Sequence, residues 1–240
     1  MRVELYHDLP GNVGAVDRLE GAHLDGLCVM VDRSTGKPAW SEEDFGRLVA
    51  AAHARGLTVR TVHWCRPSWT DRDWARATRL ASMGDLAPIF DIEHQARARS
   101  TRRRLAERSA LWGRHVVSTH AWHPETYDPT HANAPYEIQA YSTSTLLAEV
   151  GKEVMPPGWQ VKQANRPCGP TRLALAAYGQ IGLGAEEPAR YMARALRGAM
   201  ACPNIDTVAY WSLRHVLSPK NRYALPFLRD DVPGIVRGEK

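Results

Sequence analysis

Eight short runs rich in Val, Ile, Leu, Tyr and Trp recur along this chain, and most of them alternate with helix-like segments. Such runs are typical of buried parallel strands. They cover Val3–His7, Gly26–Val31, Leu57–Trp64, Ala87–Glu93, His115–Ala121, Tyr136–Tyr141, Leu173–Tyr178 and Thr207–Leu213. Strands that alternate with helices form βα units, and these build a parallel sheet.

The chain length then favours one closed arrangement of these strands. A (β/α)8 barrel typically needs roughly 250 residues, and this chain has 240. We therefore expect an α/β fold, a single (β/α)8 TIM barrel over residues 1–240, with some short or irregular helices. A doubly wound open sheet is the main alternative, but eight strands in this length favour closure.

Three helix starts are explicit in the sequence. Ser41 and Thr70 each stand three residues before an aspartate, which is the spacing of a capping box. Pro188 opens a segment whose apolar residues recur at helical spacing, while Arg190, Arg194 and Arg197 lie off that stripe. The segments after the first and fifth strands are weaker helix candidates, and residues 152–171 form a long Pro- and Gly-rich connection.

The apolar content of the sequence bears on the expected location of the protein. No apolar run reaches the roughly 18 residues that span a bilayer, and the N-terminus lacks the apolar core of a signal peptide. We expect a protein that stays in the cytoplasm of the producing cell, or that leaves it by lysis or as part of a phage particle, with no membrane partner. The four cysteines form no CxxC pair, and the sequence leaves open a disulfide between Cys168 and Cys202.

The net charge of +5 favours anionic partners, among them anionic cell-wall polymers and nucleic acid. The excess of positive charge is concentrated in residues 97–108, where a solvated helix face is the simpler interpretation. No nucleic-acid-binding motif accompanies this run. We therefore do not expect nucleic acid to be a partner.

The C-terminal ends of the predicted strands carry acids, imidazoles and aromatic rings, and barrels of this kind build their active sites at these ends. The clearest pair is Asp91 and Glu93 at the end of the fourth run. Side chains alternate along a strand, so these two carboxyl groups share one face, with backbones about 6.5 Å apart. Two neighbouring buried carboxylates raise the pKa of one of them, and a carboxyl group that stays protonated can act as a general acid. Binding of backbone amides or of an arginine at the strand end is the alternative interpretation.

At this point the chain resembles a known group of enzymes. Residues 90–93 (FDIE) are similar to the end of the fourth-strand motif of family 18 glycoside hydrolases, the chitinase-like barrels. Gln139-Ala140-Tyr141 resembles that family's sixth-strand Gln/Met-x-Tyr, and Tyr210-Trp211-Ser212 resembles its eighth strand with a floor tryptophan. The family usually carries a further Asp where this chain has Ile89. The pattern also resembles family 25 lysozyme-like barrels, in which Asp8 would match an acid on the first strand.

The resemblance implies roles for these residues. Glu93 would protonate the leaving glycosidic oxygen, and Asp91 would tune Glu93 and orient the attacking group. In a family-18-like mechanism an N-acetyl group of the substrate attacks, held by Asp91 and Tyr141. In a family-25-like mechanism Asp91 or Asp8 assists an acetamido group or water.

The other strand-end residues are candidate contacts for a polysaccharide substrate. Trp64, Trp122 and Trp211 offer flat surfaces for sugar rings, although core packing explains any one of them equally well. Polar contacts could come from Asp8, Asp32, His120, Gln139, Tyr178 and Gln180. His7, His63 and His120 could instead join Asp32 or Glu93 as metal ligands, but no HxH or HExxH spacing supports a metal, and no cofactor is expected.

The sequence thus predicts a glycoside hydrolase that cleaves an N-acetylated glycan, with peptidoglycan as the first substrate and a chitin-like polymer as the second. A catalytically weak glycan-binding or structural module of a phage particle or secretion machine is the alternative, which the missing acid at Ile89 motivates.

Overall fold

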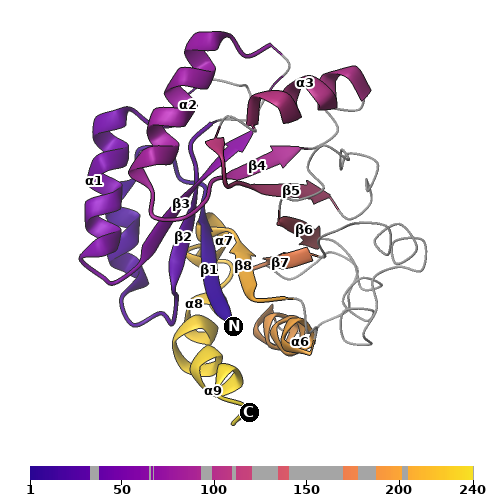
Figure 1. The fold of residues 1–240 in the computed structure, drawn as a ribbon. Helices are drawn as coiled ribbons and strands as arrows, with labels where there is room; N and C mark the ends of the chain where they lie inside the picture. Colours follow the sequence, from indigo (N-terminus) through magenta and orange to yellow (C-terminus); the bar gives the residue numbers. More distant parts are fainter. Residues whose placement is uncertain are drawn as a thin grey trace.

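The eight strands close into one parallel barrel in chain order, with β1 hydrogen-bonded to both β2 and β8 (Figure 1). The structure is a computed structural model, and it describes residues 1–32, 38–64, 66, 68–92, 99–109, 112–120, 135–140, 170–177, 188–201 and 205–239. The strands are β1 (Arg2–His7), β2 (Gly26–Met30), β3 (Thr58–Trp64), β4 (Ile89–Ile92), β5 (Val116–His120), β6 (Tyr136–Ala140), β7 (Pro170–Ala176) and β8 (Thr207–Trp211). The predicted (β/α)8 barrel is confirmed.

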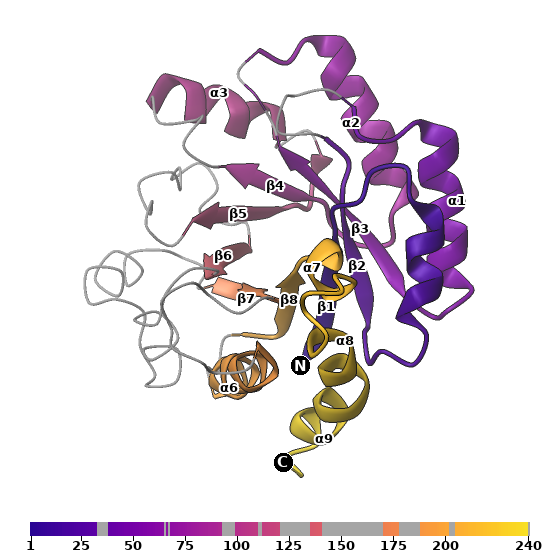
Figure 2. The same ribbon diagram turned by 180° about the vertical axis from the view of Figure 1, so that it is seen from behind.

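The described helices lie outside the barrel (Figures 1 and 2). They are η1 (Val13–Leu19), α1 (Glu42–His53), α2 (Asp71–Met83), α3 (Arg99–Ser109), α6 (Pro188–Met200), α7 (Leu213–Val216), α8 (Ala224–Pro226), η6 (Phe227–Asp231) and α9 (Val232–Val236). The segment after the first strand, a weak helix candidate in the sequence, is the 3-10 helix η1. Among the described helices, none is long and apolar enough to cross a membrane.

The predicted helix starts are also confirmed. The Ser41 hydroxyl accepts a hydrogen bond from the backbone N–H of Asp44 at the start of α1. At the start of α2, Thr70 and Asp73 bond each other's backbone N–H groups in a full capping box. Each such cap satisfies backbone donors that the first helical turn leaves free.

Helix α6 begins at the predicted Pro188 and buries its apolar stripe against the barrel wall. Met192 and Leu196 are buried in the outer core, whereas Arg190 on the other face is exposed. This outer core fills the space between the sheet and the helices, and both chain termini lie at one end of the molecule (Figures 1 and 2).

Each strand differs from its expected range by one to three residues at one end or both, and two of these differences are informative. β7 begins at Pro170, three residues earlier than predicted, and a register irregularity lies opposite it at Tyr136 and Glu137. Proline has no N–H to donate, so the first residue of a strand is a position that tolerates it. β4 ends at Ile92, so the predicted Glu93 lies outside the described residues. Cys168 and Cys202 lie outside them too, so the question that the sequence leaves open, whether these two cysteines pair or stay free thiols, is not decided.

A second core fills the barrel itself. Its buried members include Tyr6, Val62 and Ile89, and Trp64 and Trp211 pack against it. Even-numbered residues of β1 and odd-numbered residues of β4 therefore face inward. The inward positions near the C-terminal ends of the strands build the site described next.

Candidate functional site

Asp91 lies on the inner face of β4, one residue before that strand ends. It shares this face with Ile89 two residues earlier, as strand alternation requires. Its side chain is buried, and its Oδ1 accepts a hydrogen bond of 2.8 Å from the side-chain nitrogen of Gln139 on β6. A donated N–H favours the ionised form of a carboxylate. The sequence placed both residues in the site, and the structure brings them together.

Gln139 has a second bond, which fixes the orientation of its amide. Its Nε2 also donates to the Ser118 hydroxyl of β5 at 3.0 Å. Ser118 in turn donates to Glu137 at 3.0 Å, and the Tyr6 hydroxyl donates to the same carboxylate oxygen. The Oε1 atom of Gln139 is buried and has no hydrogen-bond partner among the described residues.

Two tryptophans stand at the ends of strands around this cluster. Trp64 ends β3 and is the register partner of Asp91. Trp211 ends β8, and its ring centroid lies 5.1 Å from that of Tyr6. Both side chains are partly exposed and pack against the inner core. A partly exposed aromatic ring at the C-terminal end of a barrel strand can pack against the apolar face of a sugar ring.

Asp8 follows β1, and its carboxylate contacts Arg214 in the first turn of α7. Its Oδ1 accepts a hydrogen bond of 3.0 Å from the backbone N–H of Arg214, and its Oδ2 lies 3.4 Å from Nε of Arg214. In this position Asp8 anchors the start of α7.

Asp32 lies two residues after the end of β2. Its carboxylate is 3.1 Å from Nη1 of Arg76 on α2 and 3.3 Å from Nδ1 of His63. The side chain is buried, and these contacts tie the end of β2 to α2 and β3. A substrate contact by Asp32 stays a prediction.

Two of the three histidines of the metal alternative, His7 and His63, lie on the outer side of the sheet. The His7 ring packs on Trp40, and the His63 ring packs on Trp112 with a centroid distance of 4.7 Å. Burial lowers the pKa of His7 to about 4, so its ring is neutral at neutral pH. Among the described residues no cluster of His, Cys, Asp and Glu could hold a metal ion.

Several predicted site residues lie where the structure makes no statement. Of His120 only the backbone is described, as the last residue of β5. The remaining ones lie outside the described residues: Glu93, Trp122, Tyr141, Tyr178 and Gln180. Their roles stay predictions.

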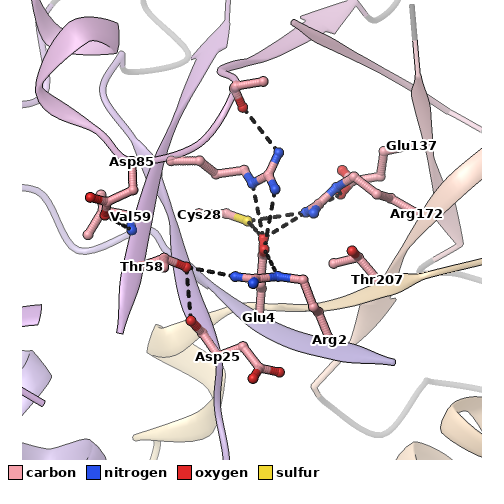
Figure 3. A network of polar contacts seen from close by, with 12 residues as sticks. Arg2, Glu4, Asp25, Cys28, Thr58, Val59, Asp85, Glu137, Arg172 and Thr207 are labelled. Atoms are coloured by element: carbon pink, nitrogen blue, oxygen red, sulfur yellow. Dashed lines mark hydrogen bonds and ion pairs between the residues drawn. The ribbon is translucent and has the colours of Figure 1, made fainter. Parts of the chain in front are cut away.

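A buried ion-pair network lies inside the barrel, toward the N-terminal ends of the strands (Figure 3). Arg172 of β7 lies 3.0 Å from Glu4 and 3.1 Å from Glu137, and Arg60 of β3 lies 3.2 Å from Glu4. Burial by itself raises the pKa of Glu4, but the guanidinium groups of Arg172 and Arg60 and the Cys28 thiol outweigh it and lower the pKa to about 2. Burial raises the pKa of the Cys28 thiol, which donates to Glu4 at 3.0 Å. Glu4 is therefore ionised and fully paired at neutral pH.

This network and the cluster at Asp91 form one continuous row across the sheet. Trp64, Asp91, Ser118, Glu137 and Arg172 are successive register partners on β3 to β7. Barrel strands tilt against the barrel axis, so a row along the hydrogen-bonding direction descends from one end of the barrel to the other. The row begins at the last residue of β3 and reaches the third residue of β7.

Of the polar members of this row, only Asp91 was predicted from the sequence, and Ser118, Glu137 and Arg172 were missed. Their signal is a charged or polar residue at alternate positions of an otherwise apolar strand. Glu4 stands between Val3 and Leu5, and Glu137 stands two residues before Gln139. In a closed barrel, that alternation marks the inward face.

A hollow among the described residues lies at the end of the barrel where the strands begin, opposite to the site at Asp91. It is lined by residues that include Leu19, Leu24 and Leu57, at the N-terminal ends of β2 and β3. That end of such barrels serves stability, and the chemistry is at the opposite end.

Comparison with known proteins shows the fold. No protein-family model matches the chain, and no curated protein matches it significantly. Among solved structures, the spore coat polysaccharide biosynthesis protein of Bacillus subtilis is similar at 10% identity with a TM-score of 0.56, covering 99% of this chain and 70% of that one.

Two further structures show that this fold carries different activities. Dihydrodipicolinate synthase of Agrobacterium tumefaciens matches at 14% identity with a TM-score of 0.53, covering 99% of this chain and 77% of that one. A maltogenic α-amylase of Thermotoga neapolitana matches at 9% identity with a TM-score of 0.50, covering 93% of this chain and 68% of that one. At these identities the similarity establishes an α/β barrel fold, and the function has to be argued from the site itself.

Proposed function

We propose that this protein is a glycoside hydrolase acting on an N-acetylated glycan, with peptidoglycan as the first substrate and a chitin-like polymer as the second. The observation that carries the proposal is the hydrogen bond between Asp91 and Gln139 on the inner face of the barrel. It holds a carboxylate near the C-terminal ends of the strands, and two other strands, β3 and β8, end in the partly exposed Trp64 and Trp211. Barrels of this fold do their chemistry at that end.

The proposed roles follow from the chemistry of these groups. Asp91 accepts an amide N–H, which favours its charged form. A charged Asp91 would raise the proton affinity of a neighbouring carboxyl group, and Glu93 follows two residues later in the sequence. Glu93 would therefore be the general acid that protonates the leaving oxygen. Asp91, with Tyr141, would orient the attacking acetamido group, as the resemblance to family 18 implies.

One observation favours the alternative of a catalytically weak glycan-binding or structural module. Ile89 occupies the position where family 18 enzymes usually carry another Asp. Its side chain is fully buried in the inner core beside Val62 and Val116. An apolar residue there supplies no further charge beneath Asp91.

Release of reducing ends separates the two proposals. Purified protein would be incubated with peptidoglycan sacculi and with chitin oligosaccharides, and both cleavage and sedimentation with the polymer would be measured. A hydrolase releases reducing ends from at least one of these substrates, whereas a binding module sediments with the polymer and releases none. If the protein neither cleaves nor binds either polymer, both proposals are wrong.

A further inference from the structure

We propose that Glu137 is a positioning residue that acts through Ser118 to hold the Gln139 amide with its nitrogen toward Asp91. Glu137 is fully buried on β6 and lies next to Asp91 neither in sequence nor in register. Its Oε1 accepts the Ser118 hydroxyl at 3.0 Å, and Ser118 accepts Gln139 Nε2 at 3.0 Å. As a statement about catalysis, this inference rests on the proposed function.

The directions of the hydrogen bonds carry the argument. A carboxylate can only accept, so the single proton of the Ser118 hydroxyl points to Glu137. Ser118 then has only lone pairs to offer Gln139 and needs a donor there. Asp91 needs a donor as well, since its carboxylate also only accepts. Both requirements are met by the nitrogen of the Gln139 amide, and neither by its oxygen.

The position of the amide oxygen agrees with this assignment. Gln139 Oε1 has no hydrogen-bond partner among the described residues, although it is buried. An unpartnered buried acceptor is unfavourable, so the amide would rotate if its nitrogen were not needed where it is. Two acceptors on the nitrogen side, one of them set by Glu137, hold it in place.

Glu137 itself is held from three sides. The Tyr6 hydroxyl of β1 donates to its Oε1, and Arg172 of β7 donates from Nε to its Oε2 at 3.1 Å. The path runs from Glu137 through Ser118 and Gln139 to Asp91. The charged or titratable groups of the described interior around it are Arg2, Glu4 and Tyr6 of β1, Cys28 of β2, Arg60 of β3, Asp91 of β4, Glu137 of β6 and Arg172 of β7. The path therefore links the ion pairs at the base of the barrel to the carboxylate at its other end.

Loss of the path should change the protonation of Asp91. Without the Ser118 hydroxyl, the Gln139 amide has one acceptor fewer on its nitrogen side and can turn its oxygen toward Asp91. An amide oxygen beside Asp91 favours the protonated carboxyl group. The reaction needs Asp91 ionised, so activity would then fail at a higher pH than in the wild type.

The first test compares Ser118→Ala with Ser212→Ala. Ser212 is also fully buried, but its hydroxyl has no hydrogen-bond partner among the described residues, so this variant controls for the loss of a buried hydroxyl. We expect Ser118→Ala to lower kcat about 10-fold with little change in KM, and to move the acidic limb of the pH profile up by about one pH unit. Ser118→Thr, which keeps a hydroxyl, should restore the wild-type limb, and Ser212→Ala should not move it.

A second test needs no turnover and keeps the inference separate from the proposed function. The side-chain amide protons of Gln139, assigned by their absence in Gln139→Met, would be followed by NMR against pH. These protons report the ionisation of Asp91, to which the amide donates. We expect the midpoint of their pH titration to rise in Ser118→Ala and in Glu137→Gln, and to stay at the wild-type value in Ser212→Ala. Unchanged Gln139 signals in folded Ser118→Ala would overturn the positioning role, whether or not the wild type cleaves a glycan. Shifted signals in a protein without glycan cleavage would uphold it and reject the proposed function.

Discussion

Nε2 of Gln139 lies 2.8 Å from Oδ1 of Asp91, although 48 positions separate the two residues in the chain. The bond crosses from β6 to β4 over the inner face of β5, which lies between them in the sheet. The inward curvature of the barrel brings the side chains of these two non-adjacent strands together. The proposed activity therefore depends on barrel closure as much as on the two residues.

Replacement of Asp91 by asparagine should impair activity while the fold is kept. Asparagine preserves the shape of the side chain but carries no charge and cannot orient an attacking group as a carboxylate does. We expect kcat to fall about 100-fold or more and the acidic limb of the pH profile to shift, because Asp91 no longer titrates and no longer sets the proton affinity of Glu93. Steady-state kinetics from pH 4 to pH 9, about the usual range for such profiles, measure both effects.

The matched control is Asp71→Asn, since Asp71 is an exposed residue in the first turn of α2. It should keep the wild-type profile. Equal activities of Asp91→Asn and wild type at every pH would contradict a role of Asp91 in the reaction.

Arg172→Met should destabilise the protein strongly. This substitution leaves Glu4 and Glu137 buried without the cation that lies between them. Removing one partner of a buried ion pair costs about 3–5 kcal/mol of unfolding free energy. Urea unfolding followed by circular dichroism measures the loss. Arg190→Met on the exposed face of α6 is the control, with an expected loss under about 0.5 kcal/mol, and similar values for the two variants would contradict the stabilising role of the network.

The variant should also respond differently to acid. In the wild type the pKa of Glu4 is lowered to about 2, so its contribution to stability is complete above the ordinary glutamate range and is lost as the pH falls toward 2. Without Arg172 the main counter-charge of Glu4 is gone. The free energy of unfolding of Arg172→Met should therefore fall less steeply between pH 4.5 and pH 2, the interval between the ordinary and the lowered pKa of Glu4.

His7 should make folding stability fall as the pH drops below neutrality. Its pKa is about 4 in the folded protein, below the ordinary value of 6.5, because burial disfavours the charged ring. Between these two pH values the unfolded chain binds a proton that the folded protein does not, so stability falls with pH. The full effect, reached near pH 4, is about 3 kcal/mol.

Unfolding free energies measured from pH 7 to pH 4 test this in His7→Gln. Glutamine can still donate to the Asn12 carbonyl, which His7 contacts at 3.2 Å, but it does not titrate. The slope against pH should become shallower in this variant and stay unchanged in His23→Gln, which replaces an exposed histidine. A wild-type slope in His7→Gln would exclude His7 as its source.

Most of the barrel could be predicted from the sequence because local signals fix it. Eight apolar runs separated by helical segments indicate the strands, and the capping residues Ser41 and Thr70 mark where two helices begin. Alternation along the fourth strand also places Asp91 on the same face as Ile89. The structure puts that face inside the barrel.

The same alternation argues against His7 as a ligand inside the barrel, an alternative that the sequence left open. His7 shares its face of β1 with Val3 and Leu5, which pack in the outer core, so its ring points away from the inside of the barrel. Asp32 could not be placed in this way, because it follows the end of β2, where the pleat no longer fixes the direction of a side chain. Its partners Arg76 and His63 come from other elements.

The polar path from Glu137 to Asp91 was beyond the reach of the sequence for a different reason. Ser118 and Glu137 meet only because β5 and β6 pair in a particular register, and register across a long connection is not written in either strand alone. Glu4 within β1 and Glu137 within β6 could have indicated a polar interior, but the sequence does not show which groups pair.

The most direct measurement of the central claim is the rate of reducing-end release by Glu93→Gln, compared with wild type and with Glu43→Gln. Glutamine keeps the shape of Glu93 but cannot deliver a proton, and general acid catalysis contributes about 10²–10⁴-fold. Glu43 lies exposed in the first turn of α1, so its variant controls for the loss of one carboxylate. We predict at least about a 100-fold loss in Glu93→Gln, with unchanged melting temperature and polymer binding, and wild-type activity in Glu43→Gln. Near-normal cleavage by Glu93→Gln, on a substrate that the wild type cleaves, would contradict the assignment of the acid and of the site.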